Sequence, residues 1–395
     1  MKETLTTRRN FLRTSALVAG GAGLGLGPRT LHPTPGTGGD EALPDVGTSL
    51  RILILGGTGF IGPHQVRYAR ERGHEVTLFN RGKTAPDMFP GLETLIGDRN
   101  GDYDALKGRS WDVCIDNSAS TPEWVTMAGE VLRNSVAHYL YVSSRSAYAD
   151  YSTVPMTAAE PTYTYETAGV EPGAERLPYG LRKALCEREA QRFFPGRCTV
   201  FRPALIVGPG DPTDRFTYWP VRIHRGGEVL SPGDPSDPCQ IIDARDLTEW
   251  MIRMAEEKHT GVYNALGPAI PRPMEQLLYG IRAVTTAETR FTWVPADFLA
   301  EHRVRPYSHM PVWMPPGPGR EGFARFDIGP EVEKGLTFRP LAVTARETLE
   351  YHFSRPEEER ENLGAGLPAE RETDVLEAWH ASRRAESKPP APRPT

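Results

Sequence analysis

Residues 51–62 read RILILGGTGFIG, and this stretch decides the fold. Its first five residues, Arg51–Leu55, have the pattern of a short buried strand, and glycines then recur at positions 56, 59 and 62. Helical sequence follows over Pro63–Arg72 and ends at Gly73, and His74–Phe79 has the pattern of a second strand. A strand, a glycine-rich turn, a helix and a strand begin a Rossmann-type doubly wound parallel sheet, whose turn binds a dinucleotide pyrophosphate at the helix N-terminus. We therefore predict an α/β fold with a nucleotide site at this turn.

The composition excludes several classes of function. The chain has 395 residues, a net charge of −5 and a sequence pI near 6.1, without a face rich in Lys or Arg. Because phosphate binding needs concentrated positive charge, nucleic acid is not expected as a partner. The cysteines form no C-x-x-C pair and have no histidine at ligand spacing, so no metal site is expected. Their spacing leaves a disulfide between Cys186 and Cys198 open.

The N-terminus has the layout of an export signal. Arg8 and Arg9 precede a weakly apolar run, Ala16–Leu26, which ends in small residues. The run is well short of the roughly 20 apolar residues that cross a bilayer, so no stable membrane span is expected. We predict that residues 1–27 are a twin-arginine signal read by the twin-arginine export machinery and that residues 28–49 are a linker. The protein is then periplasmic or extracellular, and it is cytoplasmic if the arginine pair is a coincidence.

Further motifs follow the glycine-rich turn in a fixed order. They are Gly97-Asp98, the strand Trp111–Asp116 with Asn117-Ser118-Ala119, YVSSRSAY (Tyr141–Tyr148), the YxxxK of Tyr179 and Lys183, TVFRPALIVGPGD (Thr199–Asp211), QIIDARDL (Gln240–Leu247) and ARFDIGPEVEKGLTFRPL (Ala324–Leu341). With the GxxGxxG spacing, this series resembles an extended short-chain dehydrogenase/reductase of the NAD-dependent epimerase/dehydratase family. The resemblance runs from about Arg51 to Phe353.

The resemblance implies a division of the chain. Residues 50–207 would form the NAD(P)-binding domain, to which residues 240–265 return. Residues 208–353 would form a smaller C-terminal substrate lobe, and residues 354–395 a helix and a disordered tail. Asp243, Arg245 and Asp246 are expected to form a buried ion-pair joint.

The resemblance also assigns cofactor-binding residues. They are Gly56, Thr58, Gly59, Phe60, Ile61, Gly62, Asp98, Asn117, Ser118, Lys183 and Pro203. At the end of the second strand, where an NAD enzyme carries Asp or Glu for the ribose hydroxyls, the chain has Asn80 and Arg81. An arginine there fits the 2′-phosphate of NADP, but it also fits stacking on adenine or facing solvent. Tightly bound NAD or NADP is therefore expected, with the choice between them open.

The predicted catalytic residues are Ser144, Tyr179 and Lys183. Tyr179 and Lys183 lie one helical turn apart, so they share a helix face, and a nearby ammonium should lower the pKa of the tyrosine. Counting back four residues from Tyr148 places the family's hydroxyl on Ser144, with Ser143 and Ser146 as alternatives. The family's sugar dehydratases carry Asp-Glu after this hydroxyl, whereas this chain has Arg145 and Ser146, which disfavours dehydration.

Three residues at the entry to the substrate lobe are candidates for substrate contact. Arg215 would bind an anion, Tyr218 would hydrogen-bond a hydroxyl and Trp219 would stack on a sugar face. For both aromatic residues, packing inside the lobe is an equal alternative.

Export and a dinucleotide site are compatible if the cofactor crosses the membrane inside the folded protein. Without a pool of nucleotide outside, an enzyme that takes a hydride and returns it to the same substrate still turns over. The sequence therefore favours a redox-neutral epimerase acting on a free sugar, glycoside or cyclitol. A cytoplasmic NADPH-dependent carbonyl reductase is the alternative. Of another class, an RNA- or ligand-binding protein remains open, since the chain also resembles an atypical branch of this fold that includes plastid RNA-binding proteins. A homodimer is likewise left open.

Overall fold

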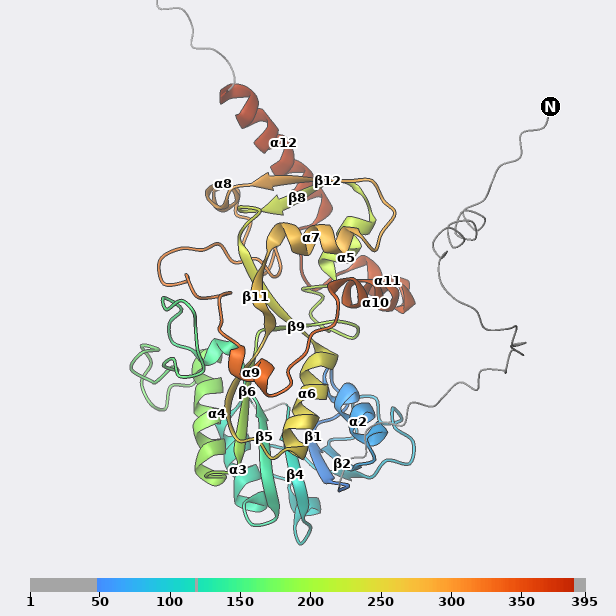
Figure 1. Cartoon of the computed structure of the whole chain (residues 1–395), viewed down its shortest axis with the longest axis vertical. Helices are drawn as coiled ribbons and strands as arrows, with labels where there is room; N and C mark the ends of the chain where they lie inside the picture. The colour runs from blue at the N-terminus through green and yellow to red at the C-terminus, as the bar shows by residue number, and fades with distance from the viewer. Residues whose placement is uncertain (1–47, 118–119, 387–395) are drawn as a thin grey trace, which may run out of the picture. The chain divides into compact units, whose positions relative to one another are not determined.

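The computed structural model describes residues 48–117 and 120–386, and its central feature is a seven-stranded, wholly parallel sheet (Figure 1). The strand order is β10-β6-β5-β4-β1-β2-β3. The strands are β1 (Arg51–Leu55), β2 (Glu75–Asn80), β3 (Thr94–Ile96), β4 (Trp111–Asp116), β5 (Val136–Val142), β6 (Cys198–Pro203) and β10 (Gly261–Ala265). The Rossmann-type doubly wound sheet predicted from the sequence is thereby confirmed.

Helices cover both faces of this sheet because the strands are apolar on both sides. Alternate residues of β1 point to opposite faces of the sheet and pack into the hydrophobic layer on each face. Ile52 and Ile54 pack with α2 (Gly62–Glu71) and α6 (Ala244–Glu256), whereas Leu53 and Leu55 pack with α3 (Pro122–Leu132) and α4 (Tyr179–Phe193). The chain leaves β1 toward one face and leaves the neighbouring β4 toward the other. This divergence opens the crevice at the carboxyl ends of the strands in which such folds bind ligands.

A second hydrophobic core lies in the C-terminal half of the chain, around Trp219, Trp313 and Leu277. Two small sheets belong to this half of the chain. The first contains β7 (Leu205–Val207), β9 (Pro238–Asp243) and β11 (Gly267–Pro273). In the second, β8 (Gly227–Pro232) pairs with β12 (Thr289–Val294). Its helices are α5 (Tyr218–His224), α7 (Met274–Arg282), α8 (Ala296–Glu301), α10 (Leu341–Ser354), α11 (Glu357–Glu361) and α12 (Ala369–Glu386). Within α12, Val375 and Leu376 are buried in this core.

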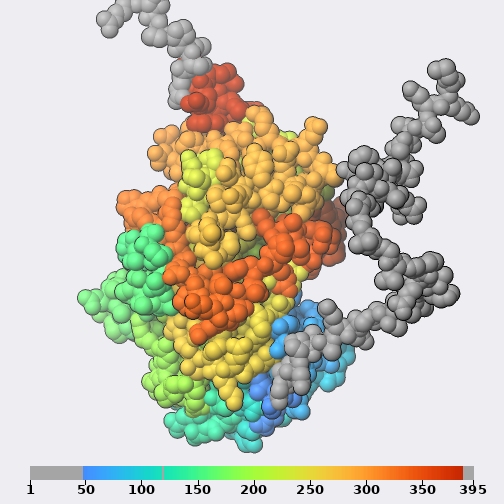
Figure 2. Space-filling model, in the orientation of Figure 1, coloured from blue at the N-terminus to red at the C-terminus, as the bar shows by residue number. Residues whose placement is uncertain are grey.

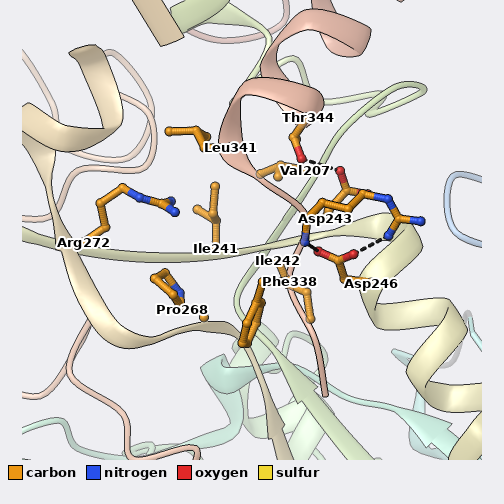
Figure 3. A pocket seen from close by; sticks show the side chains of 12 residues that line it. Val207, Ile241, Ile242, Asp243, Asp246, Pro268, Arg272, Phe338, Leu341 and Thr344 are labelled. Carbon is orange, nitrogen blue, oxygen red and sulfur yellow. Dashed lines mark hydrogen bonds and ion pairs between the residues drawn. The ribbon is translucent and has the colours of Figure 1, made fainter. Parts of the chain in front are cut away.

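A set of ion pairs ties the last helices to the sheet half. Arg245 pairs with Asp243 at 2.7 Å and with Glu347 on α10, and Arg339 pairs with Asp246. Thr344 of α10 also donates to Asp243 at 2.7 Å (Figure 3). The ion-pair joint predicted at 243–246 is confirmed, and Asp243 and Asp246 line part of a small cavity of about 30 Å³.

Helix α9 (Gly329–Glu333) lies beside strand β10, because the Asn264 amide donates to the Glu331 carboxylate at 2.6 Å. The orange chain around α9 crosses the middle of the face shown in Figure 2, between the sheet half and the second core. The C-terminal quarter of the sequence thus packs against both halves of the molecule.

Several sequence predictions concern segments or groups outside the site. Residues 1–47, which include the predicted signal, lie outside the described residues. Among the residues that the structure describes, no helix has both the length and the apolar character needed to cross a membrane. Cys186 and Cys198 are buried free thiols, so the open disulfide between them is not formed.

Candidate active site

The glycine-rich turn needs glycine at some positions for the backbone conformation and at another for close packing. Gly56 and Gly57 have φ values of 105° and 93°, a left-handed conformation that other residues adopt only with strain. A Cβ on Gly62 would lie 2.5 Å from the Gly57 backbone, so the start of α2 needs a glycine there. A Cβ on Gly59, by contrast, would meet no described atom within 4 Å. Protein packing therefore does not require Gly59, and the space above it is available to a ligand.

A cavity of about 290 Å³ opens beside this turn, at the ends of β2 and β3. Asn80, Arg81, Lys83, Asp98 and Arg99 line it together with Thr58 and Gly59. The Asn80 amide donates to the Gly56 carbonyl at 3.1 Å and accepts from the Gly82 amide at 2.8 Å, so Asn80 holds the turn in place. Arg81 and Lys83 are exposed, and neither has an ion-pair partner within residues 48–117 and 120–386.

One lining residue of this cavity, Arg99, belongs to a buried charge pair that was not predicted from the sequence. Arg99 contacts both carboxylate oxygens of Asp116, at 2.5 and 2.6 Å, and the Tyr139 hydroxyl donates to the same carboxylate at 2.6 Å. Burial would raise the pKa of Asp116, but Arg99 and Tyr139 outweigh it and hold the pKa below its usual value. The signal for this pair was an apolar strand, VCID, that ends in an aspartate.

The loop after β4 is fixed by an amide pair. Asn117 and Gln65 exchange hydrogen bonds of 2.9 and 2.6 Å, and Gln65 is fully buried on α2. The predicted Asn117 therefore lies at the crevice between β1 and β4. Ser118, predicted beside it, lies outside the described residues.

Ser144 and Tyr179 meet at the carboxyl end of β5. Both residues line one cavity, and the Ser144 hydroxyl, which accepts from the Ser146 amide at 3.1 Å, lowers the pKa of Tyr179. Tyr179 is the first residue of α4, and a Cβ on the next residue, Gly180, would overlap the Ser146 carbonyl. Because residue 180 is a glycine, the start of α4 can pack closely against the turn at Ser144–Ser146, and Tyr179 and Ser144 line the same cavity.

A second buried network decides which serine is available. Ser143 donates to Glu187, and Arg202 pairs with the same carboxylate at 2.7 Å. All three residues are buried, so Ser143 is committed to the core. Of the three serines considered from the sequence, Ser144 is the one whose hydroxyl acts on the pKa of Tyr179.

The titration of Tyr179 differs from the sequence expectation. Burial raises the pKa of Tyr179, while the Ser144 hydroxyl, Arg215 and Arg182 lower it without reversing the rise. The Lys183 ammonium is buried and donates to the Val142 carbonyl at 2.7 Å, with the Tyr141 ring 4.7 Å away. Lys183 thus faces the sheet, and the cations that act on Tyr179 are arginines.

Tyr179 and Ser144 border a cavity of about 300 Å³, a volume at the lower end of the range for small-molecule sites. Its other lining residues include Phe60, Pro203, Asp211, Thr213, Arg215 and Tyr307. Arg145 fixes the covering loop, since it donates to the Phe323 carbonyl at 2.9 Å and to the Tyr307 hydroxyl at 2.8 Å. The cavity has polar groups facing one another across the point where a substrate hydroxyl would meet Tyr179.

Comparison with known proteins identifies the family. The sequence matches the NAD dependent epimerase/dehydratase family over residues 52–100 and 117–265. The chain belongs to this family. The matched residues include all those that line the cavity beside the glycine-rich turn, and all but Tyr307 of those that line the cavity beside Tyr179.

Relatives within the epimerase/dehydratase family are distant. The chloroplast stem-loop binding protein of 41 kDa b from Arabidopsis thaliana is 28% identical over 226 residues, which are 53% of this chain and 56% of the relative. A UDP-glucose 4-epimerase from Neisseria meningitidis is 28% identical over 169 residues, which are 35% and 46% of the two chains. The chain thus spans about half the length of these curated relatives.

Solved structures share the fold. The Bordetella bronchiseptica enzyme WbmG, solved in complex with NAD, superposes with a TM-score of 0.57 at 16% identity, over 83% of this chain and all of that one.

Two predicted substrate residues lie elsewhere than expected for this epimerase/dehydratase chain. Trp219 is fully buried and its indole donates to the Pro311 carbonyl at 2.8 Å, and Tyr218 is also buried in the second core. Neither lines the cavity beside Tyr179, so their expected contact with substrate is corrected to lobe packing. Helix α5 begins at Tyr218, and its inward face belongs to the core, whereas Arg215 precedes the helix and reaches the cavity.

Lys183 gives a test of this geometry that is independent of activity. Burial lowers the pKa of Lys183 from 10.5 to about 8. Between these values the unfolded chain binds a proton that the folded chain does not, so stability rises with pH. Relative to Lys183→Met, the unfolding free energy of wild type should rise by up to about 3 kcal/mol between pH 8 and 10.5.

The measurement is urea unfolding of nucleotide-free protein at a series of pH values. Below pH 8 the difference between the two proteins should be constant, because both states of wild type are protonated there. A difference that does not change up to pH 10.5 would mean that Lys183 keeps an ordinary pKa in the folded protein.

Proposed function

We propose that this protein is an NAD(P)-dependent epimerase-type oxidoreductase that acts on a small polyhydroxylated compound. The observation that carries the proposal is the Ser144–Tyr179 hydroxyl pair at the edge of the cavity, with Ser143 diverted to Glu187. In this proposal Tyr179 accepts the proton of the substrate hydroxyl, and Ser144 donates a hydrogen bond to the same oxygen. A bound nicotinamide dinucleotide supplies the hydride acceptor.

The residues present fit such a dinucleotide. Gly59 leaves space for the pyrophosphate, and the cavity lined by Asn80, Arg81 and Asp98 adjoins it. Lys183 is buried against β5, next to the crevice where the ribose of the nicotinamide would lie. These residues would hold the cofactor while Tyr179 and Ser144 act on the substrate.

For the cofactor we propose NADP. Its 2′-phosphate needs cations that are not already neutralised, and Arg81 and Lys83 meet that condition among the described residues, whereas Arg99 is taken by Asp116. Support for NAD would require a carboxylate at the end of β2, where the chain has Asn80.

Redox-neutral turnover is proposed on the basis of the export signal that the sequence predicts at residues 1–27. A protein that crosses the membrane folded would carry its nucleotide with it and have no external pool for exchange. A cycle that returns the hydride to the same substrate needs no exchange. This favours epimerisation of a free sugar, a glycoside or a cyclitol.

The test is the nucleotide content of protein purified from the exported fraction. Denaturation should release about one nicotinamide dinucleotide per chain, and its mass should be that of NADP. Arg81→Ala should lower retention of NADP by about tenfold, the loss of one exposed phosphate contact, and leave retention of NAD unchanged. The same substitution at the surface lysine Lys107, which lines neither cavity, is the control. Release of NAD alone would overturn the choice of NADP.

A second candidate is an NADPH-dependent carbonyl reductase, which the unpaired Arg81 and Lys83 favour equally. The two candidates differ in their need for added nucleotide. An epimerase cycle proceeds with the retained cofactor, whereas a reductase stops after one turnover unless NADPH is supplied. An empty site combined with activity only on added NADPH would select the reductase.

A further inference from the structure

Asp211 is a buried carboxylate, and one of its two oxygens accepts no hydrogen bond from the described residues. It lies in the segment between β7 and α5 and is 3% exposed. Its Oδ1 accepts from the Thr213 amide at 2.9 Å and from the Thr213 hydroxyl at 2.7 Å. Its Oδ2 is buried and has no hydrogen-bond partner among residues 48–117 and 120–386. Asp211 lines the same cavity as Ser144 and Tyr179.

Such an oxygen costs stability, because a buried charged acceptor without a donor has lost its water and gained no partner. Burial accordingly raises the pKa of Asp211 above its usual value. Unsatisfied buried groups are rare in folded proteins, and those that persist in a cavity are typical of groups that act on a ligand.

Arg215 complements this oxygen from the same segment. Its Nε donates to the Thr213 hydroxyl at 2.9 Å, so Thr213 orients both Asp211 and Arg215. Its guanidinium lies over the Tyr307 ring at 5.9 Å and lowers the pKa values of both Asp211 and Tyr179. Within the described part of the chain, no carboxylate lies in ion-pair distance of Arg215.

We propose that Asp211 and Arg215 form a clamp for a second hydroxyl of the substrate, beside the hydroxyl that reacts at Tyr179. A hydroxyl suits both partners, because it donates to Asp211 Oδ2 and accepts from the Arg215 guanidinium. A substrate that carries only the reacting oxygen would leave Asp211 Oδ2 without a donor and the terminal nitrogens of Arg215 without an acceptor. The inference rests on the proposed function and assigns two residues to a second hydroxyl of its polyhydroxylated substrate, so simple alcohols and apolar ketones are excluded.

The test uses cyclic alcohols that differ only in the number of hydroxyls: cyclohexanol, the cis and trans cyclohexane-1,2-diols, and myo-inositol. Full-length protein saturated with NAD+ or NADP+ is assayed for single-turnover reduction of its bound nucleotide, because a redox-neutral cycle gives no net reduction, and kcat/KM is taken from the dependence of this rate on alcohol concentration. We expect kcat/KM of wild type to be at least about 100-fold higher for the best polyol than for cyclohexanol, since sites built around substrate hydroxyls reject analogues that lack them. In Asp211→Asn and Arg215→Gln this preference should fall to less than about fivefold.

A binding measurement separates the clamp from the chemistry. Tyr179→Phe, which is expected to bind without turnover, should still be stabilised against heat by the best polyol and not by cyclohexanol. That stabilisation should be lost in the double variant Tyr179→Phe/Asp211→Asn. If no alcohol reduces the nucleotide but this Asp211-dependent binding is seen, the proposed function fails and the clamp stands. Equal kcat/KM for polyols and cyclohexanol, or the absence of selective binding, overturns the clamp.

Folding controls keep these outcomes interpretable. Asp211→Asn removes an unsatisfied charge, so its Tm should equal or exceed that of wild type, whereas a structural carboxylate would show a lower Tm. Asp150→Asn, an exposed carboxylate outside the cavity, should leave Tm and the polyol preference unchanged. A lower Tm of Asp211→Asn together with an unchanged preference would assign Asp211 to structure and overturn the clamp.

Discussion

Tyr179→Phe is expected to reduce turnover by about 10³-fold, within the range for loss of a general base, while the bound nucleotide is retained. The substitution removes the phenolic hydroxyl of Tyr179 at the cavity and leaves the ring. The ring is half exposed at the cavity and the helix start is set by Gly180, so the fold should be unaffected. The measurement is turnover per retained nucleotide.

Two further variants sharpen this result. Tyr279→Phe changes an exposed tyrosine on α7, away from the cavity, and should keep full activity. Ser144→Ala should lose activity by about 10²-fold, because one donor to the developing oxyanion is lost. If Tyr179→Phe keeps the activity of Tyr279→Phe, Tyr179 is not the base.

Gly62→Ala should abolish nucleotide binding and lower the unfolding free energy by about 3 kcal/mol, the upper end of the cost of overpacking. The added Cβ would lie 2.5 Å from the Gly57 backbone, which cannot move without opening the turn. Urea unfolding and the nucleotide content of the purified protein measure the two effects.

Gly59→Ala is the matched control for this prediction. Its Cβ would meet no described atom within 4 Å, so the unfolding free energy should stay within about 0.5 kcal/mol of wild type. Nucleotide affinity should nevertheless fall at least about tenfold, because the methyl group occupies the space left for the pyrophosphate. Unchanged affinity in Gly59→Ala would show that the nucleotide does not approach the turn there.

The sequence alone was sufficient for the sheet and for the position of the cavity beside the glycine-rich turn. RILILGGTGFIG contains a strand, a turn and a helix start within 12 residues, and these signals are local. In a parallel doubly wound sheet, the segments after the strands gather at one edge. The order of the motifs therefore placed Gly59, Asn80 and Asn117 near one another, and Ser144 near Tyr179, without knowledge of side-chain packing.

The tertiary structure determined which interaction partner each side chain has. Ser143 and Ser144 are neighbours in sequence, but they have different partners. Ser143 donates a hydrogen bond to Glu187, 44 residues later, whereas the Ser144 hydroxyl lowers the pKa of Tyr179. Arg145 is held by Tyr307, 162 residues away. The sequence could not supply these facts, because burial and the choice of a partner depend on groups that only folding brings together. Asp211 shows this most directly: an aspartate after a glycine is common in a turn, and only the packed structure leaves its Oδ2 buried without a donor.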